Sequence, residues 1–273
     1  MTVTDPSAQT GTSSPAPAVS RAVMILSTLA EGRGTELSLA DLARAIGAPK
    51  SSAFNICVVL EQAQLISKRE YGYVLGRRNV ELGGAYLTGF DQVREFYRAC
   101  SSSPALREEL VHLAVLDGTD VVYLARHEGA APLRLSAGVG DRFPASITAV
   151  GNALLMALDP HDVEARYAAV GDFPSYTSHS TKTFEELQAK LEASRERGYS
   201  LDRSETFPNV NGIAMPVPAR HPGENALAIG VSFIGSTDDF QVPEERMMRV
   251  AEALREAVRQ LTNPMSRDAL MAP

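Results

Sequence analysis

The chain has 273 residues, of which 44% are apolar and 22% charged, a length that allows about two domains with separate cores. No apolar stretch approaches the roughly 18–20 residues of a membrane span, and no secretory signal is visible, so we expect a cytoplasmic protein without a membrane partner. Cys57 and Cys100 lie far apart in the sequence, and no disulfide is expected between them in that compartment.

The net charge of −7 argues, at face value, against nucleic acid as a partner, but the charge is unevenly distributed. Residues 20–85 hold eight basic and six acidic residues, whereas residues 86–273 hold 18 basic and 26 acidic residues. The acidity therefore belongs to the C-terminal two thirds of the chain.

The N-terminal residues 1–19 are mainly Ser, Thr, Pro and Ala without periodic apolar positions, a composition typical of a disordered tail. Ser20 can cap a first helix, and Gly32 and Gly34 lie just past its end. The apolar residues of this helix are Val23, Met24, Leu26 and Leu29.

Two short helices are predicted next. Ser38 and Asp41 form a capping-box-like start, and Gly47 ends that helix. Pro49 suits the first turn of the following helix. The apolar stripes of the two helices are Leu39, Leu42, Ala43 and Ile46, and Ala53, Ile56, Cys57 and Leu60. Two short helices joined by a Gly-containing turn constitute a helix-turn-helix.

The segment 65–75 alternates in polarity around a turn at Gly72, which predicts a β-hairpin and hence a winged helix-turn-helix over residues 20–80. A linker helix over residues 81–94 follows, and it could pair between subunits. The segment 95–262 is predicted to be an α/β domain, followed by a C-terminal tail over 263–273. The fold class is therefore α+β.

Within residues 95–262, the dipeptide Asp117-Gly118 joins two β-rich runs and predicts a hairpin. The predicted strands are Val111–Leu116, Thr119–Ala125, Leu133–Ala137, Ile213–Val217 and Ala226–Ile234. The predicted helices are Thr148–Leu158, Thr183–Arg197 and Pro243–Leu261.

Catalytic and metal-binding patterns are weak. The segment Gly230–Gly235 lacks the spacing of a nucleophile elbow, and Gly138-Val139-Gly140 lacks the third glycine of a dinucleotide fingerprint. The five histidines are scattered, and we interpret most of them as surface residues or residues with satisfied hydrogen bonds. We expect neither an enzyme nor a cofactor or metal site.

The DNA hypothesis rests on the exposed face of the second helix of the helix-turn-helix and on the hairpin. The N-terminal end of such a helix usually enters the major groove, where Asn55 can pair bidentately with adenine and Phe54 can touch a thymine methyl. The predicted DNA-binding residues are Lys50, Ser51, Ser52, Phe54, Asn55, Lys68, Arg69, Tyr71 and Arg77. The alternatives are a helical domain with solvated charges or a protein-binding winged helix.

The sequence resembles the IclR family of bacterial transcriptional regulators. The resemblance is carried by blocks near residues 20–22, 37–43, 49–52, 73–76, 81–83, 113–118, 148–155, 197–199 and 213–217. It implies an N-terminal winged helix-turn-helix, a linker helix that dimerises, and a C-terminal GAF-like α/β domain that binds a small organic effector. It also implies homodimers or homotetramers that act on palindromic operators in double-stranded DNA. Many relatives have an arginine where this chain has Asn55, so its operator should differ from theirs.

The resemblance also implies a set of effector-binding residues. They are Leu135, Phe143, Ala149, Val150, Asp202, Val210, Gly212, Gly230 and Ser232. Gly212 replaces a frequent cysteine and Gly230 a frequent serine, which favours a bulkier, more apolar ligand such as an aromatic acid. Alternatively, both glycines are turn or bulge positions. Backbone N–H groups near Ala149 and Val150 could receive a carboxylate at a helix start.

The sequence thus predicts a DNA-binding repressor of a catabolic operon, whose operator affinity responds to a small organic acid or derivative. The alternatives are an activator of the same fold, or a metabolic enzyme with an appended winged helix.

Overall fold

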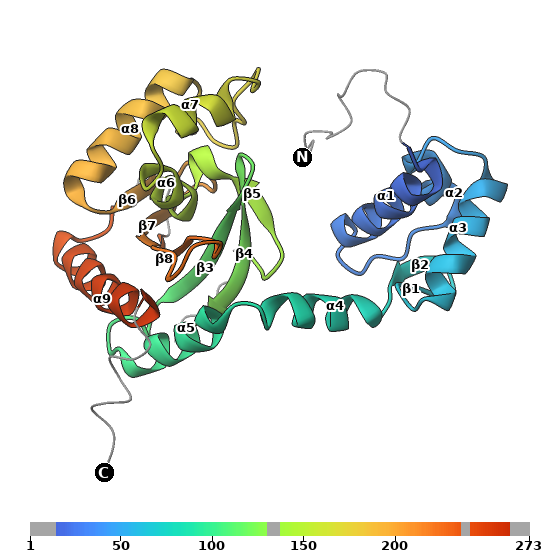
Figure 1. The fold of residues 1–273 in the computed structure, drawn as a ribbon, viewed down its shortest axis with the longest axis horizontal. Helices are drawn as coiled ribbons and strands as arrows, with labels where there is room; N and C mark the ends of the chain where they lie inside the picture. The colour runs from blue at the N-terminus through green and yellow to red at the C-terminus, as the bar shows by residue number, and fades with distance from the viewer. Residues whose placement is uncertain (1–14, 130–136, 236–240, 263–273) are drawn as a thin grey trace, which may run out of the picture. The chain divides into compact units, whose positions relative to one another are not determined.

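The computed structural model describes residues 15–129, 137–235 and 241–262, which divide into two compact units with the boundary between Gly89 and Phe90. The boundary between the units falls within the predicted linker. Each unit is described separately (Figure 1).

The first unit is a helix-turn-helix with a wing. Its elements are α1 (Pro17–Glu31), α2 (Leu39–Ala45), α3 (Lys50–Gln62), β1 (Ile66–Lys68), β2 (Tyr73–Leu75) and α4 (Arg78–Leu87). The core is small, because three short helices bury only one face each. Its fully buried members include Ile25, Leu42, Ala53 and Cys57.

The capping box of α2 is present as predicted. The Ser38 hydroxyl accepts a hydrogen bond from the N–H of Asp41 at 3.2 Å, and Oδ2 of Asp41 accepts one from the N–H of Ser38 at 3.2 Å. The wing is also confirmed, with β1 and β2 paired antiparallel. Leu37, just before α2, bridges to Tyr73 and ties the wing to the helices.

Two boundaries differ from the sequence prediction. Helix α1 begins at Pro17 rather than at a Ser20 cap, so the last part of the predicted tail is helical; residues 1–14 lie outside the described residues. Proline fits this position, because an N–H group at the first helical residue would have no hydrogen-bond acceptor within the helix. The single linker helix over 81–94 is wrong: α4 ends at Leu87, and α5 starts at Asp91 after an interruption that contains Gly89.

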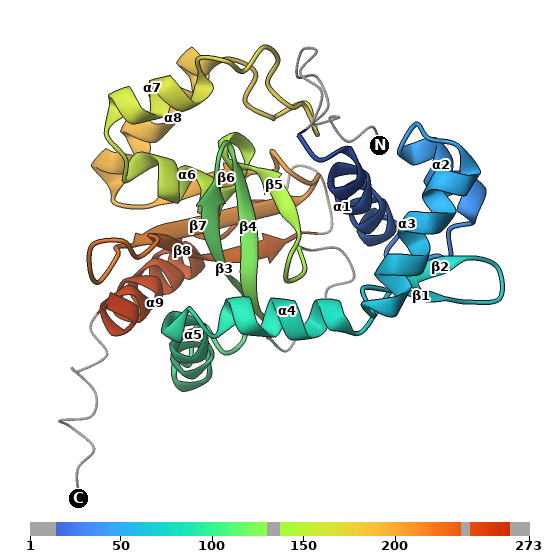
Figure 2. The same ribbon diagram turned by 45° about the vertical axis from the view of Figure 1, so that its right-hand side comes forward.

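The second unit is a six-stranded antiparallel sheet with helices on both faces (Figures 1 and 2). The strand order is β5-β4-β3-β8-β7-β6. The strands are β3 (Leu110–Asp117), β4 (Asp120–His127), β5 (Arg142–Pro144), β6 (Ser200–Arg203), β7 (Val210–Val217) and β8 (Leu227–Ile234). The β3–β4 hairpin at Asp117-Gly118 is confirmed.

One face of the sheet carries the helices α6 (Ala149–Met156), α7 (Pro160–Tyr167) and α8 (Phe184–Arg197), and a short 3₁₀ turn (Ala145–Ile147) precedes α6. The other face carries α5 (Asp91–Ser102) and α9 (Glu244–Thr262). All eight residues of α6 are buried, so this helix is the centre of its layer. The sequence prediction missed α7, β5 and β6. The predicted strand over 133–137 lies outside the described residues except for Ala137, which is not in a strand.

Candidate functional site

The predicted recognition surface of the first unit is the exposed side of α3. Ala53 and Cys57 are fully buried on the opposite side, which turns Lys50, Ser51 and Asn55 toward solvent. Phe54 is 46% exposed, unusual for a large apolar side chain, and Ser52 is half-buried. The first turn of α3 therefore presents one cation, hydroxyl and amide groups, and an aromatic ring, a set that can read both phosphates and base edges.

The wing adds further cations to this unit. Lys68 and Arg69 are exposed, and the Tyr71 side chain is 76% exposed at the tip. Two hydrogen bonds from backbone N–H groups fix the tip. Arg69 N–H donates to the Gly72 carbonyl, and Tyr71 N–H donates to Oε2 of the Glu36 side chain, both at 2.7 Å. Arg77 is exposed, but its Nε donates to Gln64 Oε1 at 3.1 Å, which holds it beside the end of α3.

In the second unit, the paired strands β6, β7, β8 and β3 form the floor of a cavity beneath α6. Asp202, Gly212 and Ser232 lie directly opposite one another on β6, β7 and β8. The next row along this face holds Gly230 of β8 between Ala214 on one side and His112 of β3 on the other. Because directly opposed residues share a face, both rows point toward α6.

The hollow between this floor and the start of α6 is a small cavity of about 40 Å³. It brings together all the effector-site residues from the sequence prediction that the structure describes. They are Phe143, Ala149, Val150, Asp202, Val210, Gly212, Gly230 and Ser232. Leu135 lies outside the described residues.

The cavity also has lining residues that the sequence analysis missed. They include His112, Tyr123, Thr148, Thr206 and Phe207. Aromatic rings form one wall: Phe143 lies edge-on to Tyr123 at 5.9 Å and to Phe207 at 5.6 Å between ring centroids. Alternation along the predicted β3–β4 hairpin could have indicated which side chains share a face, but not which face α6 covers.

The chain makes a tight, capped turn into the start of α6. The Thr148 hydroxyl accepts a hydrogen bond from the N–H of Gly151 at 3.1 Å and so caps the helix. A Cβ at Gly151 would lie 2.4 Å from Cα of Ala145, so only glycine lets the chain turn this tightly into the helix. The first-turn N–H groups of Ala149 and Val150 have no acceptor within the helix, and both residues line the cavity.

Asp202 is the acidic group of the cavity lining. Burial raises its pKa to about 7, and the nearby charge of Glu205 acts in the same direction. A hydrogen bond at 2.7 Å from the N–H of Glu205 opposes this rise, as does one at 3.2 Å from the hydroxyl of Thr206. This carboxyl group can therefore gain or lose a proton near neutral pH.

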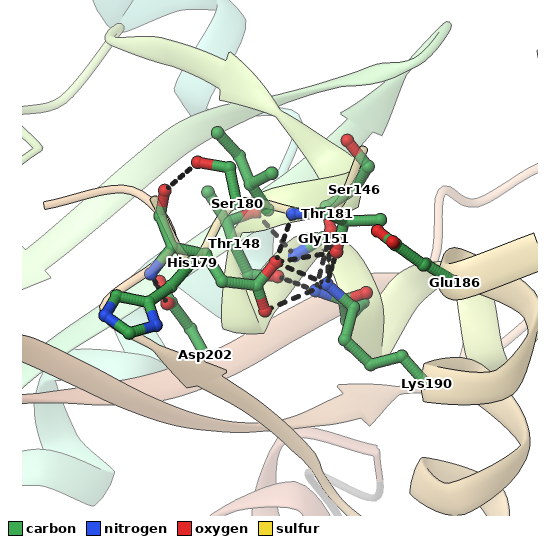
Figure 3. Close-up of polar contacts among 12 residues, drawn as sticks. Ser146, Thr148, Gly151, His179, Ser180, Thr181, Glu186, Lys190 and Asp202 are labelled. Atoms are coloured by element: carbon green, nitrogen blue, oxygen red, sulfur yellow. Dashed lines mark hydrogen bonds and ion pairs between the residues drawn. The ribbon is translucent and has the colours of Figure 1, made fainter. Parts of the chain in front are cut away.

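Lys190 of α8 forms hydrogen bonds with the segments at the edge of the cavity. Its Nζ donates to the Ser146 carbonyl and to Oγ1 of Thr181, both at 2.6 Å, and to Oε2 of Glu205 at 2.8 Å (Figure 3). Ser146 precedes α6, and Glu205 follows β6 next to the lining residue Thr206. Burial lowers the pKa of Lys190, while the carboxylate of Glu205 opposes that change. One ammonium group thus joins α8 to the segments on both sides of the cavity.

His112 departs from the interpretation of most histidines as surface or satisfied residues. Its side chain is buried in the cavity wall with only 4% of the residue exposed, and Nε2 has no hydrogen-bond partner in the described part of the chain. Burial, with a smaller contribution from Arg126, lowers its pKa to about 4, so the ring is neutral at neutral pH.

No helix within residues 15–129, 137–235 and 241–262 combines the length and apolar character needed to cross a membrane. Among these residues, no three His, Cys, Asp or Glu side chains gather as a metal site either.

Comparison with known proteins agrees with this architecture. Residues 102–263 match the family described as bacterial transcriptional regulator IclR C-terminal, and residues 18–70 match the IclR helix-turn-helix domain. The HTH-type transcriptional regulator XynR of Escherichia coli is 28% identical over 246 residues, which cover 88% of this chain and 96% of the relative. The HTH-type transcriptional repressor AllR of Klebsiella pneumoniae is 25% identical over 263 residues, covering 96% and 93%.

Among solved structures, an IclR homologue from Microbacterium hydrocarbonoxydans complexed with 4-hydroxybenzoate shares the fold, with a TM-score of 0.72 and 22% identity. The match covers 90% of this chain and 97% of that chain. The two domain matches together span most of the described residues in the order winged helix, then α/β domain. The chain therefore belongs to the IclR family of bacterial transcriptional regulators.

Proposed function

We propose that this protein is a repressor whose affinity for a palindromic operator is altered by a small organic acid bound beneath the start of α6. The observation that carries this proposal is the cavity: helix-start N–H groups at Ala149 and Val150 meet an apolar, partly aromatic lining that includes Phe143. Such N–H groups favour an anion, and the apolar wall favours the rest of an organic acid.

Aromatic acids are the first class of ligand to test for binding in this cavity. Rings at Phe143, Tyr123 and Phe207 line the cavity, and edge-to-face packing would accommodate another ring. The relative AllR is named a repressor, and the Microbacterium homologue is described as complexed with 4-hydroxybenzoate. The name of AllR supports the choice of repression, and the 4-hydroxybenzoate complex supports the choice of ligand class. We propose a catabolic operon as the target.

DNA contact is assigned to α3 and the wing. Lys50, Ser51, Ser52, Phe54 and Asn55 would enter the major groove, because they occupy the exposed N-terminal part of α3. Lys68, Arg69, Tyr71 and Arg77 would reach the flanking backbone or the minor groove. With four cations assigned to DNA contact in an acidic chain, specific binding would rely on two half-sites.

A homodimer or homotetramer would supply the two half-sites. The helix α4 has no buried residue, and Val80, Leu82 and Tyr86 are each more than half exposed in the single chain. Apolar side chains on such a helix are better placed against a second copy than in water. Two-fold symmetry of the protein would then match a palindrome in DNA.

The test measures DNA and acid binding separately. Full-length protein is titrated with DNA from upstream of its own gene and with random DNA at several salt concentrations, while calorimetry follows binding of benzoate and the hydroxybenzoates. Tighter binding to the upstream DNA, together with saturable acid binding, is the expected result. Equal affinity for both DNAs contradicts the repressor role, and conversion of an acid into product contradicts a regulatory role in favour of catalysis.

A further inference from the structure

The tip of the wing, residues 69–72, has little support from the hairpin itself. Strands β1 and β2 have three residues each, and an isolated two-stranded hairpin is at best marginally stable in water. Within the tip, the N–H of Arg69 donates to the Gly72 carbonyl. Tyr71 is 76% exposed, so it packs little against the rest of the unit. The orientation of the tip therefore depends on contacts made from outside the hairpin.

The segment just before α2 provides those contacts. Leu37 and Tyr73 exchange two backbone hydrogen bonds, at 3.1 and 2.8 Å. Gly72 lies so close to this segment that a Cβ atom there would be 2.2 Å from the Leu37 carbonyl oxygen. Both contacts involve backbone atoms, and they hold the point at which the tip enters β2.

Glu36 is the side chain that extends this contact to the tip. Its Oε2 accepts a hydrogen bond from the Tyr71 N–H at 2.7 Å. Ser38, two residues later, is the N-cap of α2 and forms the capping box with Asp41. Glu36 is therefore anchored beside a capped helix start, and its hydrogen bond ties the tip to the helix-turn-helix.

The charge of Glu36, in contrast, opposes DNA binding. In the proposed function Lys68, Arg69 and Tyr71 reach the flanking DNA, whose phosphates repel a carboxylate. The Glu36 carboxylate nevertheless lies 2.7 Å from the backbone nitrogen of Tyr71. A hydrogen bond to a charged acceptor is roughly twice as strong as one between neutral groups, which favours a carboxylate as the acceptor. Glu36 thus has two opposing effects, a charge that repels phosphates and an acceptor that orders the wing.

We propose that Glu36 is a positioning residue for DNA binding, which holds the backbone of Tyr71 so that the wing tip reaches the DNA flanking the site read by α3. This inference rests on the proposed function, since it requires the wing to contact flanking DNA. Glu36 itself makes no contact with DNA. Its acceptor oxygen raises the affinity through Arg69 and Tyr71, because a tip already held in one orientation loses less conformational entropy on binding.

Three variants of the full-length protein separate the charge from the acceptor. Glu36→Gln removes the charge and keeps an acceptor oxygen, whereas Glu36→Ala removes both. Glu70→Ala is the matched control, because it removes an exposed carboxylate from the same tip. Glu36→Gln and Glu70→Ala should bind DNA as tightly as the wild type or more tightly. Glu36→Ala should bind roughly tenfold more weakly than Glu36→Gln.

The length of the flanking DNA distinguishes positioning of the wing from a general loss of stability. Footprinting on DNA from upstream of the gene defines the bound segment. Fluorescence anisotropy then compares a duplex of that length with one trimmed at each end by about 5 base pairs, half a helical turn. The wild type, Glu36→Gln and Glu70→Ala should prefer the longer duplex. Glu36→Ala should lose this preference, whereas partial unfolding would weaken binding to both duplexes alike and leave their ratio unchanged.

Hydrogen exchange of the Tyr71 amide tests the same contact without DNA. Exchange should be slow in the wild type and in Glu36→Gln, and fast in Glu36→Ala. Equally fast exchange in all three proteins would overturn the inference, as would a preference for the longer duplex that persists in Glu36→Ala. Either result leaves the proposed function intact. A wild type that binds both duplexes equally would overturn both the inference and the assignment of the wing to flanking DNA.

Discussion

Gly230 lies so close to Val150 that a Cβ atom at residue 230 would be 2.9 Å from Cγ1 of Val150. The same atom would lie 2.9 Å from Cβ of Ala214. Gly230 is in the middle of a strand and does not have positive φ, so it is neither a turn nor a bulge position. Gly212 is similar, with a Cβ placed 2.9 Å from Cβ of Ala149. Both glycines let α6 approach the sheet, so Ala149 and Val150 occupy part of the volume that the missing side chains would fill.

The first prediction follows from this contact. Gly230→Ala should destabilise the protein by about 1–3 kcal/mol, because the added methyl group forces α6 away from β8. It should also weaken acid binding, since Val150 lines the cavity. Urea unfolding checks the stability, with the exposed Gly171→Ala as control, because nothing lies within 4 Å of a Cβ there. Unchanged stability of Gly230→Ala would mean that α6 does not pack this closely.

The second prediction concerns the ammonium group of Lys190. Lys190→Met should cost about 3–5 kcal/mol of unfolding free energy, because it leaves the buried carboxylate of Glu205 without its cation. Denaturant unfolding measures the effect. Lys182→Met, at an exposed lysine nearby, should change stability by less than about 0.5 kcal/mol. If the two variants are equally stable, Lys190 is not what holds the segments around the cavity.

The third prediction is a pH dependence set by Asp202. Its pKa rises from the ordinary 3.8 to about 7 in the folded protein. Between about pH 4 and 7 the folded state therefore keeps a proton that the unfolded state releases, so this group lowers the unfolding free energy as pH rises. Asp202→Asn removes that contribution. The unfolding free energy of the variant minus that of the wild type should rise from pH 4 to 7 and then level off.

His112 acts in the opposite direction over much of the same range. Its pKa falls from 6.5 to about 4 on folding, so the unfolded state binds the extra proton and stability increases as pH rises from about 4 to 6.5. The two contributions partly cancel in the wild type, which is why the variant difference is the quantity to measure. A difference for Asp202→Asn that does not change with pH would show that Asp202 titrates normally.

The fourth prediction separates base reading from phosphate contact on α3. Asn55→Ala should lose discrimination between operator and random DNA by about 1–3 kcal/mol, with little loss on random DNA. Lys50→Ala should weaken binding to both and lower the slope of log affinity against log salt by about 0.9. Fluorescence anisotropy measures the affinity of each variant for both DNAs. Gln62→Ala, at the far end of α3, is the control. Equal losses on the two DNAs for Asn55→Ala would remove Asn55 from direct readout.

Local signals in the sequence were sufficient for the helix-turn-helix. The Ser38–Asp41 capping box and the apolar stripes are interactions within one or two turns, and the hairpin at Asp117-Gly118 depends on two residues. Helix α1 was placed too late, because Ser20 can serve equally well inside a helix, where its hydroxyl faces the Ala16 carbonyl. The elements β5 and β6 have three and four residues, too few for periodicity to be visible.

The cavity could not be predicted from local pattern, because it depends on pairing between distant strands. His112 reaches the site only because β3 lies beside β8, more than 100 residues later in the chain. The contact of Lys190 with the Ser146 carbonyl likewise spans 44 residues. The predicted effector residues came from family resemblance, and the structure gathers the described ones around one hollow.

We propose that a ligand in the cavity changes the affinity of the winged helices for DNA. A ligand can do this only if it binds the DNA-competent and DNA-incompetent states unequally. The decisive measurement is the affinity for upstream DNA with and without a saturating concentration of an acid that calorimetry shows to bind. We predict a change of about 5- to 150-fold. An acid that saturates the cavity and leaves the DNA affinity unchanged would contradict the account.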